Sequence, residues 1–400
     1  MVNREPFFEA VREAPSLQAS GEICPSPLLI YDLPEISLAL SRFEAILEGL
    51  PATLLYSVKA CPHLALLDHL RPRVGGFSLS SVFEARLAME SLAKDARQDA
   101  VLHLTSPGLR SCDWQVPCPL THISFNSLEQ MERLSPEVPE TASIGLRINP
   151  GLSAIQDPRY DPCRQQSKLG IPLEALATLN SQAHPSLDRV EGLHFHSHFR
   201  SREADGLDRT LKALETRLEP LFPQLQWINL GGGYAPRSDG DILGFRQVIE
   251  AFSHRFRGRI FLEPGHALIG EAGTLRATVI DTFSRDGMAI AVLDTGVHHL
   301  PEVFEYQRPP QLLEQDPSGA YSCLLAGESC LAGDIFGCYP FQRLPVVGDT
   351  LNFIGVGAYS LVKSSRFNGH DFPSIGFRDS DRQLRIIKRH GFDAYRDLWS

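Results

Sequence analysis

Residues 53–59 read Thr-Leu-Leu-Tyr-Ser-Val-Lys, a short apolar run that ends on a charged side chain. Similar β-rich runs return along the chain, and most of them are separated by stretches with helical spacing of apolar residues. Eight runs follow one another: 53–59, 76–80, 100–105, 122–126, 143–149, 190–196, 226–231 and 259–263. Eight strand-helix units in about 225 residues are typical of a (β/α)8 barrel of the TIM type. A doubly wound open sheet is the structural alternative.

The segments between these runs predict amphipathic helices. Three of the apolar sets are Leu64, Leu67 and Leu70; Phe83, Leu87 and Met89; and Leu211, Leu214 and Leu218.

The rhythm changes after Gly265, where helical patterning mostly gives way to strand-like runs separated by turn residues. These runs are 275–282, 289–293, 321–325, 350–353 and 384–387. They predict an antiparallel β-domain, to which the early run 28–32 adds a strand. We therefore expect a barrel over residues 36–268 and a β-domain built from residues 1–35 and 269–400.

Composition excludes several classes of partner. The chain has 400 residues, of which 43% are hydrophobic and 22% charged, with a formal net charge of -10 and no basic stripe, which argues against a nucleic-acid partner. No apolar run approaches the roughly 20 residues of a membrane-spanning helix, and Glu5, Glu9 and Glu13 stand where a secretory signal would be basic. The eight cysteines form no CxxC pair and histidine spacing gives no zinc-finger pattern, so we expect reduced thiols, no metal site and a cytoplasmic location.

Polar residues end most of the eight runs, at the edge of a barrel where chemistry gathers. They are Lys59, Ser80, Thr105, Asn126, Asn149, His196, Gly231 and Glu263. A lysine that closes an apolar strand loses solvation, which lowers its pKa and makes the neutral amine available as a nucleophile toward carbonyls. The alternative for Lys59 is a surface lysine whose stem lies along apolar residues.

Two further features stand beside the lysine. Gly231, Gly232 and Gly233 follow the seventh run, where barrels of this type commonly expose backbone N–H groups toward a phosphate, although a glycine triplet can also be a simple turn. Glu263 precedes a Pro-Gly turn that would aim its carboxylate at the barrel mouth. An imine-forming lysine, a phosphate cradle and an acid for a pyridinium nitrogen together meet the requirements of pyridoxal phosphate.

Nine segments then carry a resemblance that spans about 310 residues in a consistent order. They are residues 56–60, 80–87, 145–151, 167–170, 192–196, 230–233, 262–265, 327–334 and 357–369. With them the chain resembles the alanine-racemase-like pyridoxal-phosphate decarboxylases, and within these the carboxynorspermidine (carboxyspermidine) decarboxylases. The segments Cys-Leu-Ala-Gly-Asp at 330–334 and Phe-Asn-Gly at 367–369 favour this group over diaminopimelate and ornithine decarboxylases, where an acidic residue would stand in place of Leu331.

The resemblance implies roles for the barrel residues. Lys59 would hold the cofactor covalently, His196 would stack on its ring and Glu263 would pair the ring nitrogen. The phosphate would be held by Gly232, Gly233 and Tyr359.

It also implies roles for residues of the β-domain. Cys330 would be the general acid that reprotonates the substrate Cα after CO₂ leaves, delivered across the interface of a homodimer with shared active sites. Asp294 would meet the distal amine of the substrate, and Asp334 would shape the shared site with Cys330.

The implied function is decarboxylation of carboxynorspermidine or carboxyspermidine in polyamine biosynthesis. Alternatives are a decarboxylase of another amino acid with a distal amine, such as diaminopimelate or a siderophore precursor, and a non-catalytic pyridoxal-phosphate carrier. Racemisation is disfavoured because Glu263 stands where a racemase usually has an arginine. The chain departs from the family pattern at Ser197-His-Phe-Arg200, and the roles of His198, Arg200, His266, His298 and His299 stay open.

Overall fold

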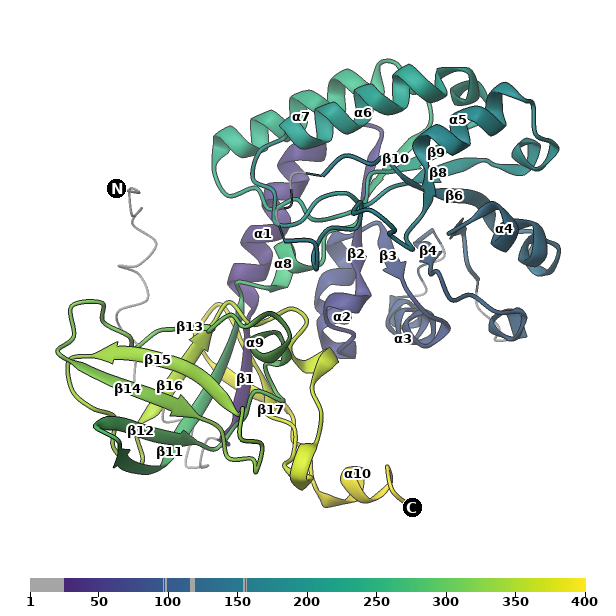
Figure 1. The fold of residues 1–400 in the computed structure, drawn as a ribbon. Coiled ribbons are helices and arrows are strands. Elements are labelled where there is room, and N and C mark those ends of the chain that lie inside the picture. Colours follow the sequence, from purple (N-terminus) through teal and green to yellow (C-terminus); the bar gives the residue numbers. More distant parts are fainter. Residues whose placement is uncertain (1–24, 96, 98, 116–118, 154, 156) are drawn as a thin grey trace.

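The computed structural model describes residues 25–400 except 96, 98, 116–118, 154 and 156. The expectation built on Glu5, Glu9 and Glu13 therefore lies outside the described residues. Figure 1 shows a helix-covered barrel beside a second sheet with few helices. β1 (Leu28–Asp32) belongs to the second sheet and leads directly into α1 (Leu33–Leu47), whose first turn is capped by the Asp32 carboxylate, which accepts a hydrogen bond from Glu35 N at 3.3 Å.

Eight parallel strands close into a barrel, which confirms the predicted fold. They are β2 (Ala52–Ser57), β3 (Gly76–Leu79), β4 (Val101–Thr105), β5 (His122–Phe125), β6 (Ser143–Asn149), β8 (Gly192–His194), β9 (Trp227–Asn229) and β10 (Arg259–Leu262). Each of the eight predicted runs contains one of these strands or most of it. β5 pairs with β6 and β2 pairs with β10, so the sheet has no open edge and the doubly wound alternative is excluded.

Helices alternate with the barrel strands. They are α2 (Leu64–Leu70), α3 (Val82–Leu92), α4 (Leu128–Leu134), α5 (Leu173–Ser181), α6 (Asp205–Leu218), α7 (Asp239–Ser253) and the short α8 (His266–Ile269). The two-residue strand β7 (Ile171–Pro172) pairs with the end of β6. Between β4 and β5 the described residues form a 3-10 turn, Ser111–Gln115.

The helix predicted from Phe83, Leu87 and Met89 is confirmed as α3, and Leu87 and Met89 pack against the core, but Phe83 does not. α3 buries Ala85, Ala88 and Leu92, whereas Phe83 is 72% exposed. The spacing of Phe83, Leu87 and Met89 identified a helix, but the small alanines face the barrel because they let the helix approach the strands closely.

Side chains inside the barrel form two layers. The lower layer is a separate apolar cluster of Leu55, Val101, Trp227 and Phe261. Gly145 and Gly192 make room for the indole, since a Cβ on either would lie within 2.4 Å of it. Strand residues that point inward recur every second position, so the residues two further along form the upper layer. They are polar and buried: His103, His194, Asn229 and Glu263.

The second domain is a mainly antiparallel sheet in the order β15-β14-β12-β11-β1-β17-β18, with β16 on β11 and β13 on β16. Its remaining strands are β11 (Gly273–Arg285), β12 (Met288–Leu293), β13 (Gln311–Leu312), β14 (Tyr321–Ala326), β15 (Ile335–Phe341), β16 (Thr350–Ile354), β17 (Ser374–Arg378) and β18 (Leu384–Lys388). Two pairs, β1 with β17 and β12 with β14, are parallel.

Sequence patterning missed part of this domain. β15 contains Gly337 and Pro340 and β17 contains Gly376, residues that interrupt the apolar alternation by which strands are recognised. Two short helices, α9 (Pro301–Tyr306) and α10 (Phe392–Arg396), also lie where only strands were expected. No helix among the described residues has the length and apolar character needed to cross a membrane.

Candidate active site

Lys59 lies at the rim of the barrel, on the 3-10 turn Val58–Ala60 that follows β2. The turn is tied on both sides: Ser57 N donates to Pro264 O at 3.2 Å, and Tyr359 N donates to Ala60 O at 2.9 Å. The first bond connects the turn to the end of β10 and the second connects it to the β-domain. The position of Lys59 therefore depends on both parts of the molecule.

Burial lowers the pKa of Lys59, and the nearby Arg147 guanidinium lowers it further, while Glu263 and Glu84 raise it; the net direction is downward. A lowered pKa increases the fraction of neutral amine near pH 7, and the neutral amine is the form that attacks a carbonyl. The predicted reactive lysine thus has the electrostatic surroundings that its chemistry needs.

Glu263 lies directly after β10 and is 3% exposed. His194 Nε2 lies 3.1 Å from its Oε1, and Asn229 Nδ2 donates to its Oε2 at 3.1 Å. Burial by itself raises the pKa of this carboxyl, but the charge and hydrogen bond of His194, with Lys59 nearby, outweigh it and hold the pKa well below the usual value. Glu263 is therefore an ionised carboxylate inside the barrel mouth.

The triplet Gly231, Gly232 and Gly233 forms a turn that only glycine fits. A Cβ on Gly231 would lie 2.2 Å from Phe195 O, one on Gly232 would lie 2.5 Å from Glu263 O, and one on Gly233 would lie 2.0 Å from His198 O. Gly231 and Gly233 also have positive φ of 72° and 88°. The turn presents bare backbone beside Glu263, as a phosphate cradle requires.

His196 is held next to this turn, since its Nδ1 accepts a hydrogen bond from Gly232 N at 3.0 Å. Burial, with Lys59 and Arg147 nearby, keeps the pKa of His196 well below its usual value. The ring is thus neutral and the Gly232 bond assigns its proton to Nε2. A neutral ring is suited to stacking on a flat, electron-poor group.

Tyr359 enters from the β-domain in a left-handed conformation with φ 61°. Tyr31 OH donates to Gly357 O at 2.9 Å and so fixes the segment just before it. Burial raises the pKa of Tyr359 to about 12, so the phenol keeps its proton and can donate it to an oxygen anion. Six predicted residues, Lys59, His196, Gly232, Gly233, Glu263 and Tyr359, are thereby brought together.

These residues fit pyridoxal phosphate. The amine of Lys59 suits the aldehyde, the ionised Glu263 suits a protonated ring nitrogen, and the turn at Gly232 and Gly233, packed too tightly against Glu263 O and His198 O for any Cβ, offers side-chain-free backbone to a phosphate. His194 Nδ1 is a buried polar atom with no partner in the described structure, which marks this layer as incompletely satisfied by the chain alone.

The other three predicted residues form a second group in the β-domain. Cys330 is exposed on the loop between β14 and β15, and its backbone N donates to Asn368 Oδ1 at 2.8 Å. The two segments that distinguished the family group, at 330–334 and 367–369, therefore touch. Among the described residues, no recorded hydrogen bond or ion pair joins Cys330 to the group around Lys59.

The carboxylates of Asp294 and Asp334 bind backbone amides. Asp334 is 3% exposed and accepts from Val297 N at 2.7 Å, Ser329 N at 3.1 Å and Ser329 Oγ at 2.5 Å. Asp294 accepts from Thr278 N at 2.7 Å. Asp334 thus holds the loop that carries Cys330, and a direct contact of either acid with substrate stays a prediction.

Sequence reasoning missed several residues of the site. His103, His194, Asn229 and Arg147 line the barrel mouth, and each lies within a predicted run of which only the last residue was considered. The signal that could have found His194 and Asn229 is the two-residue period, because both stand two positions before a residue already singled out.

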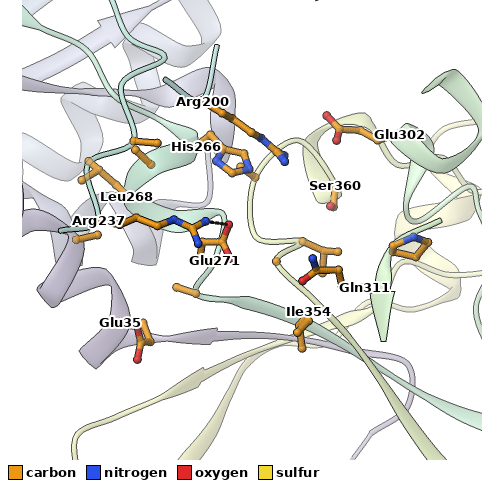
Figure 2. A pocket seen from close by; sticks show the side chains of 18 of the residues that line it. Glu35, Arg200, Arg237, His266, Leu268, Glu271, Glu302, Gln311, Ile354 and Ser360 are labelled. Atoms are coloured by element: carbon orange, nitrogen blue, oxygen red, sulfur yellow. Dashed lines mark hydrogen bonds and ion pairs between the residues drawn. The ribbon is translucent and has the colours of Figure 1, made fainter. Parts of the chain in front are cut away.

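A cleft of about 520 Å³ lies between the barrel and the β-domain (Figure 2). Arg200 comes from a barrel loop, His266 from the start of α8 and Glu302 from α9. The Arg200 side chain extends toward Glu302 across the opening. Burial raises the pKa of Glu302, although Arg200, Lys363 and Arg308 oppose the change. No hydrogen bond or ion pair within 4.0 Å is recorded for its carboxylate in the described chain. Glu302 is therefore an acid available to a cation, and it was not predicted.

Burial, with Arg200 and Arg237 nearby, lowers the pKa of His266 to about 3, so this ring is neutral. Arg237 pairs with Glu271 at 2.7 Å, as the dashed line in Figure 2 shows, and is thus already compensated. Arg200, with φ 51°, makes no ion pair within the described part of the chain. Arg200 and Glu302 are thus two charged groups of the cleft lining that can meet a ligand.

Comparison with known proteins agrees with this geometry. Residues 33–275 match the family model described as pyridoxal-dependent decarboxylase, pyridoxal binding domain. Carboxyaminopropylagmatine decarboxylase of Synechocystis is 32% identical, over 93% of this chain and 95% of that protein. Carboxynorspermidine/carboxyspermidine decarboxylase of Herminiimonas arsenicoxydans is 26% identical, over 92% and 98%.

The crystal structure of carboxynorspermidine decarboxylase from Campylobacter jejuni, complexed with norspermidine, superposes with a TM-score of 0.80. It is 25% identical and the match covers 93% of this chain and 99% of that one. The match includes the β-domain, which a bare barrel carrier of the cofactor lacks, so the alternative of a non-catalytic carrier falls. The chain belongs to the pyridoxal-dependent decarboxylases, and pyridoxal phosphate is its cofactor.

Proposed function

We propose that this enzyme decarboxylates a carboxypolyamine, an α-amino acid whose side chain is a polyamine tail, with carboxynorspermidine or carboxyspermidine as substrate. The observation that carries the chemistry is the buried, ionised Glu263 beside a glycine cradle and a lysine of lowered pKa. The substrate class is supported by the relatives in Synechocystis and Herminiimonas, which are similar over nearly the whole chain.

Bound pyridoxal phosphate supplies an electron-withdrawing ring that accepts the electron pair of the broken bond between Cα and the carboxylate. Lys59 would hold the cofactor through its amine, whose lowered pKa favours the neutral, nucleophilic form. Glu263 would keep a proton on the ring nitrogen, because its own carboxylate stays ionised. His196 would face the ring as a neutral imidazole, and Gly232, Gly233 and the protonated phenol of Tyr359 would hold the phosphate.

Cys330 donates the proton that replaces CO₂ at Cα, and it comes from the second subunit of a homodimer. Support comes from its exposure and its surroundings. Phe304, Leu331 and Phe367 are 56%, 39% and 45% exposed and line a hollow of about 280 Å³ next to it. Exposed apolar side chains gathered in this way are typical of an interface with a partner.

The cationic tail of the substrate lies in the cleft of Figure 2, with an ammonium group on Glu302. A half-buried carboxylate without a hydrogen-bond partner binds a cation more strongly than one in water, because the local dielectric constant is lower. Asp294, bound to Thr278 N, has one carboxylate oxygen left and stays a second candidate for the tail.

Mass spectrometry of products tests the substrate. The purified enzyme is given equal amounts of carboxynorspermidine, carboxyspermidine, carboxyaminopropylagmatine and diaminopimelate, and kcat/KM is measured for each. We expect a preference for a carboxypolyamine and a large rise in KM for Glu302→Gln with kcat little changed. Turnover of diaminopimelate alone would contradict the proposal.

Diaminopimelate is the second candidate, and Arg200 is the observation that favours it. Its guanidinium, from a barrel loop that departs from the family pattern, points into the cleft and would attract a distal carboxylate. In a carboxypolyamine enzyme this cation would instead compete with the substrate amine for Glu302. Arg200→Ala separates the two cases. If the substrate is a carboxypolyamine, the variant should have a lower KM for it, because a competing cation is removed. If the substrate is diaminopimelate, the variant should have a higher KM, because the partner of the distal carboxylate is lost.

We further propose that the barrel module spans 36–268 and that 1–35 and 269–400 make up the β-domain, of which residues 1–24 lie outside the described part of the chain. We also propose that the enzyme works in the cytoplasm. The six cysteines for which the structure describes a side chain are free thiols, as expected in a reducing compartment.

A further inference from the structure

Asn229, at the end of β9, has every polar atom of its side chain engaged. Its Oδ1 accepts a hydrogen bond from Gly231 N at 2.8 Å. Since the oxygen is thereby identified, the other terminal atom is Nδ2, which donates to Glu263 Oε2 at 3.1 Å and to His103 Nδ1 at 2.8 Å. Asn229 is 0% exposed, so no solvent competes for these bonds.

This arrangement fixes the protonation of its neighbours. Because Asn229 donates to His103 Nδ1, that atom carries no proton, and His103 donates from Nε2 to Ser124 Oγ at 2.7 Å. Burial lowers the pKa of His103 well below its usual value, so its ring is neutral. The hydrogen bonds that link Gly231, Asn229, His103 and Ser124 therefore allow only one assignment of the protons on the Asn229 amide and the His103 ring.

The side chain at position 229 affects the charge of Glu263, and an amide and a carboxylic acid at this position would affect it differently. The Asn229 amide donates a hydrogen bond and cannot give up a proton, so Glu263 receives stabilisation and stays ionised. A carboxylic acid at the same distance would share one proton with Glu263, as two close carboxyl groups do. The same side chain also holds the amide of Gly231, from which the turn to Gly232 and Gly233 begins.

We propose that Asn229 is a positioning residue that couples the two halves of the cofactor seat: it keeps Glu263 ionised and aimed at the ring nitrogen, and it sets the glycine turn that receives the phosphate. The inference rests on the proposed role of Glu263. It adds a residue to which neither the family resemblance nor the comparisons assign a role, and one whose two functions are separable by mutation.

The test uses holoenzyme reconstituted with pyridoxal phosphate labelled with ¹⁵N in the ring, and reads ring-nitrogen protonation by NMR. Asn229→Asp keeps an oxygen for Gly231 N but replaces the donor to Glu263 with a second carboxyl. We expect the ¹⁵N signal to move toward that of an unprotonated pyridine while cofactor retention changes little. Asn229→Ala removes both bonds and should also raise the cofactor dissociation constant by about tenfold.

Two comparisons make the result decisive. Trp227 lies on β9, two residues before Asn229, and its Nε1 donates to Ser143 Oγ on β6. Ser143→Ala removes that hydrogen bond and should leave the ¹⁵N signal unchanged. Glu263→Gln should move the signal; if it does not, the role of Glu263 fails and this inference with it. If Glu263→Gln moves the signal but Asn229→Asp leaves it at the wild-type position, the inference about Asn229 is overturned and the proposed function stands. If Asn229→Asp does not fold, unchanged signal and retention in Asn229→Ala overturn it equally.

Discussion

At the scale of single residues, this site depends on which groups lose water and which keep a partner. Lys59 and Glu263 are both buried, yet their pKa values are both lowered: burial favours the neutral amine, whereas hydrogen bonds and nearby cations favour the carboxylate. One polar pocket thus prepares a nucleophile and an anion within the same barrel mouth.

Lys59→Ala should abolish the visible absorbance of the bound cofactor, because no other residue supplies the covalent link. Activity should fall to background in the same preparation. The absorption spectrum of the purified variant checks this. A spectrum like that of the wild type would show that another amine holds the cofactor.

Gly233→Ala should prevent stable binding of the cofactor, because the new Cβ would lie 2.0 Å from His198 O at a residue with φ 88°. Gly240→Ala is the matched control, since its Cβ would meet nothing closer than 3.7 Å in the first turn of α7. Cofactor retained after gel filtration is the measurement. Equal retention in both variants would mean that the turn does not contact the phosphate.

At the scale of elements, the loop between β14 and β15 is organised by one carboxylate. The Asp334 carboxylate accepts hydrogen bonds from Val297 N and from the backbone N and the hydroxyl of Ser329. These bonds fix the segment that carries Cys330. The loop can therefore offer an exposed thiol in one geometry although it has no regular structure of its own.

Asp334→Ala should lower kcat by about tenfold or more while the cofactor absorbance stays, because the loop carrying Cys330 loosens. It should also reduce the free energy of unfolding by about 1–3 kcal/mol, since buried donors lose their acceptor. Asp379→Ala, which removes a carboxylate from the turn between β17 and β18, is the control and should keep its kcat. A rise in KM at constant kcat would instead support direct contact of Asp334 with substrate.

At the scale of the whole molecule, the site of one chain contains the lysine, the cradle and the acid, whereas the thiol lies elsewhere on the β-domain surface. Mixing Lys59→Ala and Cys330→Ala subunits should therefore restore about a quarter of wild-type activity. Half of the randomly formed dimers contain one subunit of each kind, and in each of these mixed dimers one of the two active sites has both Lys59 and Cys330. Size-exclusion chromatography verifies that the subunits exchange. Exchange without recovery would show that each site is built within one chain.

Acid should destabilise the enzyme well above the pH at which its carboxylates titrate. Burial lowers the pKa of His122 and of His198 to about 4, whereas an unfolded histidine titrates near 6.5. Between these values the unfolded state binds protons that the folded state does not, so stability is full above about pH 6.5 and falls as the pH drops toward 4. Each such group contributes up to about 1.4 kcal/mol per pH unit. Thermal melting between pH 7.5 and 4.5 measures this, and a constant Tm down to pH 5 would contradict it.

The eight β-rich runs, the lysine at the end of the first and the glycines after the seventh were readable from the sequence, because strand period and backbone freedom are local properties. Local pattern also failed where it was interrupted: Gly337, Pro340 and Gly376 hid β15 and β17. Phe83 belongs to the apolar spacing that predicted α3, yet its side chain is exposed, because hydrophobicity alone does not say which face of a helix the barrel covers.

The residue types of the site were thus determined by the sequence, and their protonation and grouping by the tertiary structure. Asn229 and His194 became recognisable only when the closed barrel placed them against Glu263, and Glu302 only when the β-domain brought α9 to the cleft. The physical reason is that a pKa depends on lost solvent and on charges distant in sequence, and both exist only after the chain has folded.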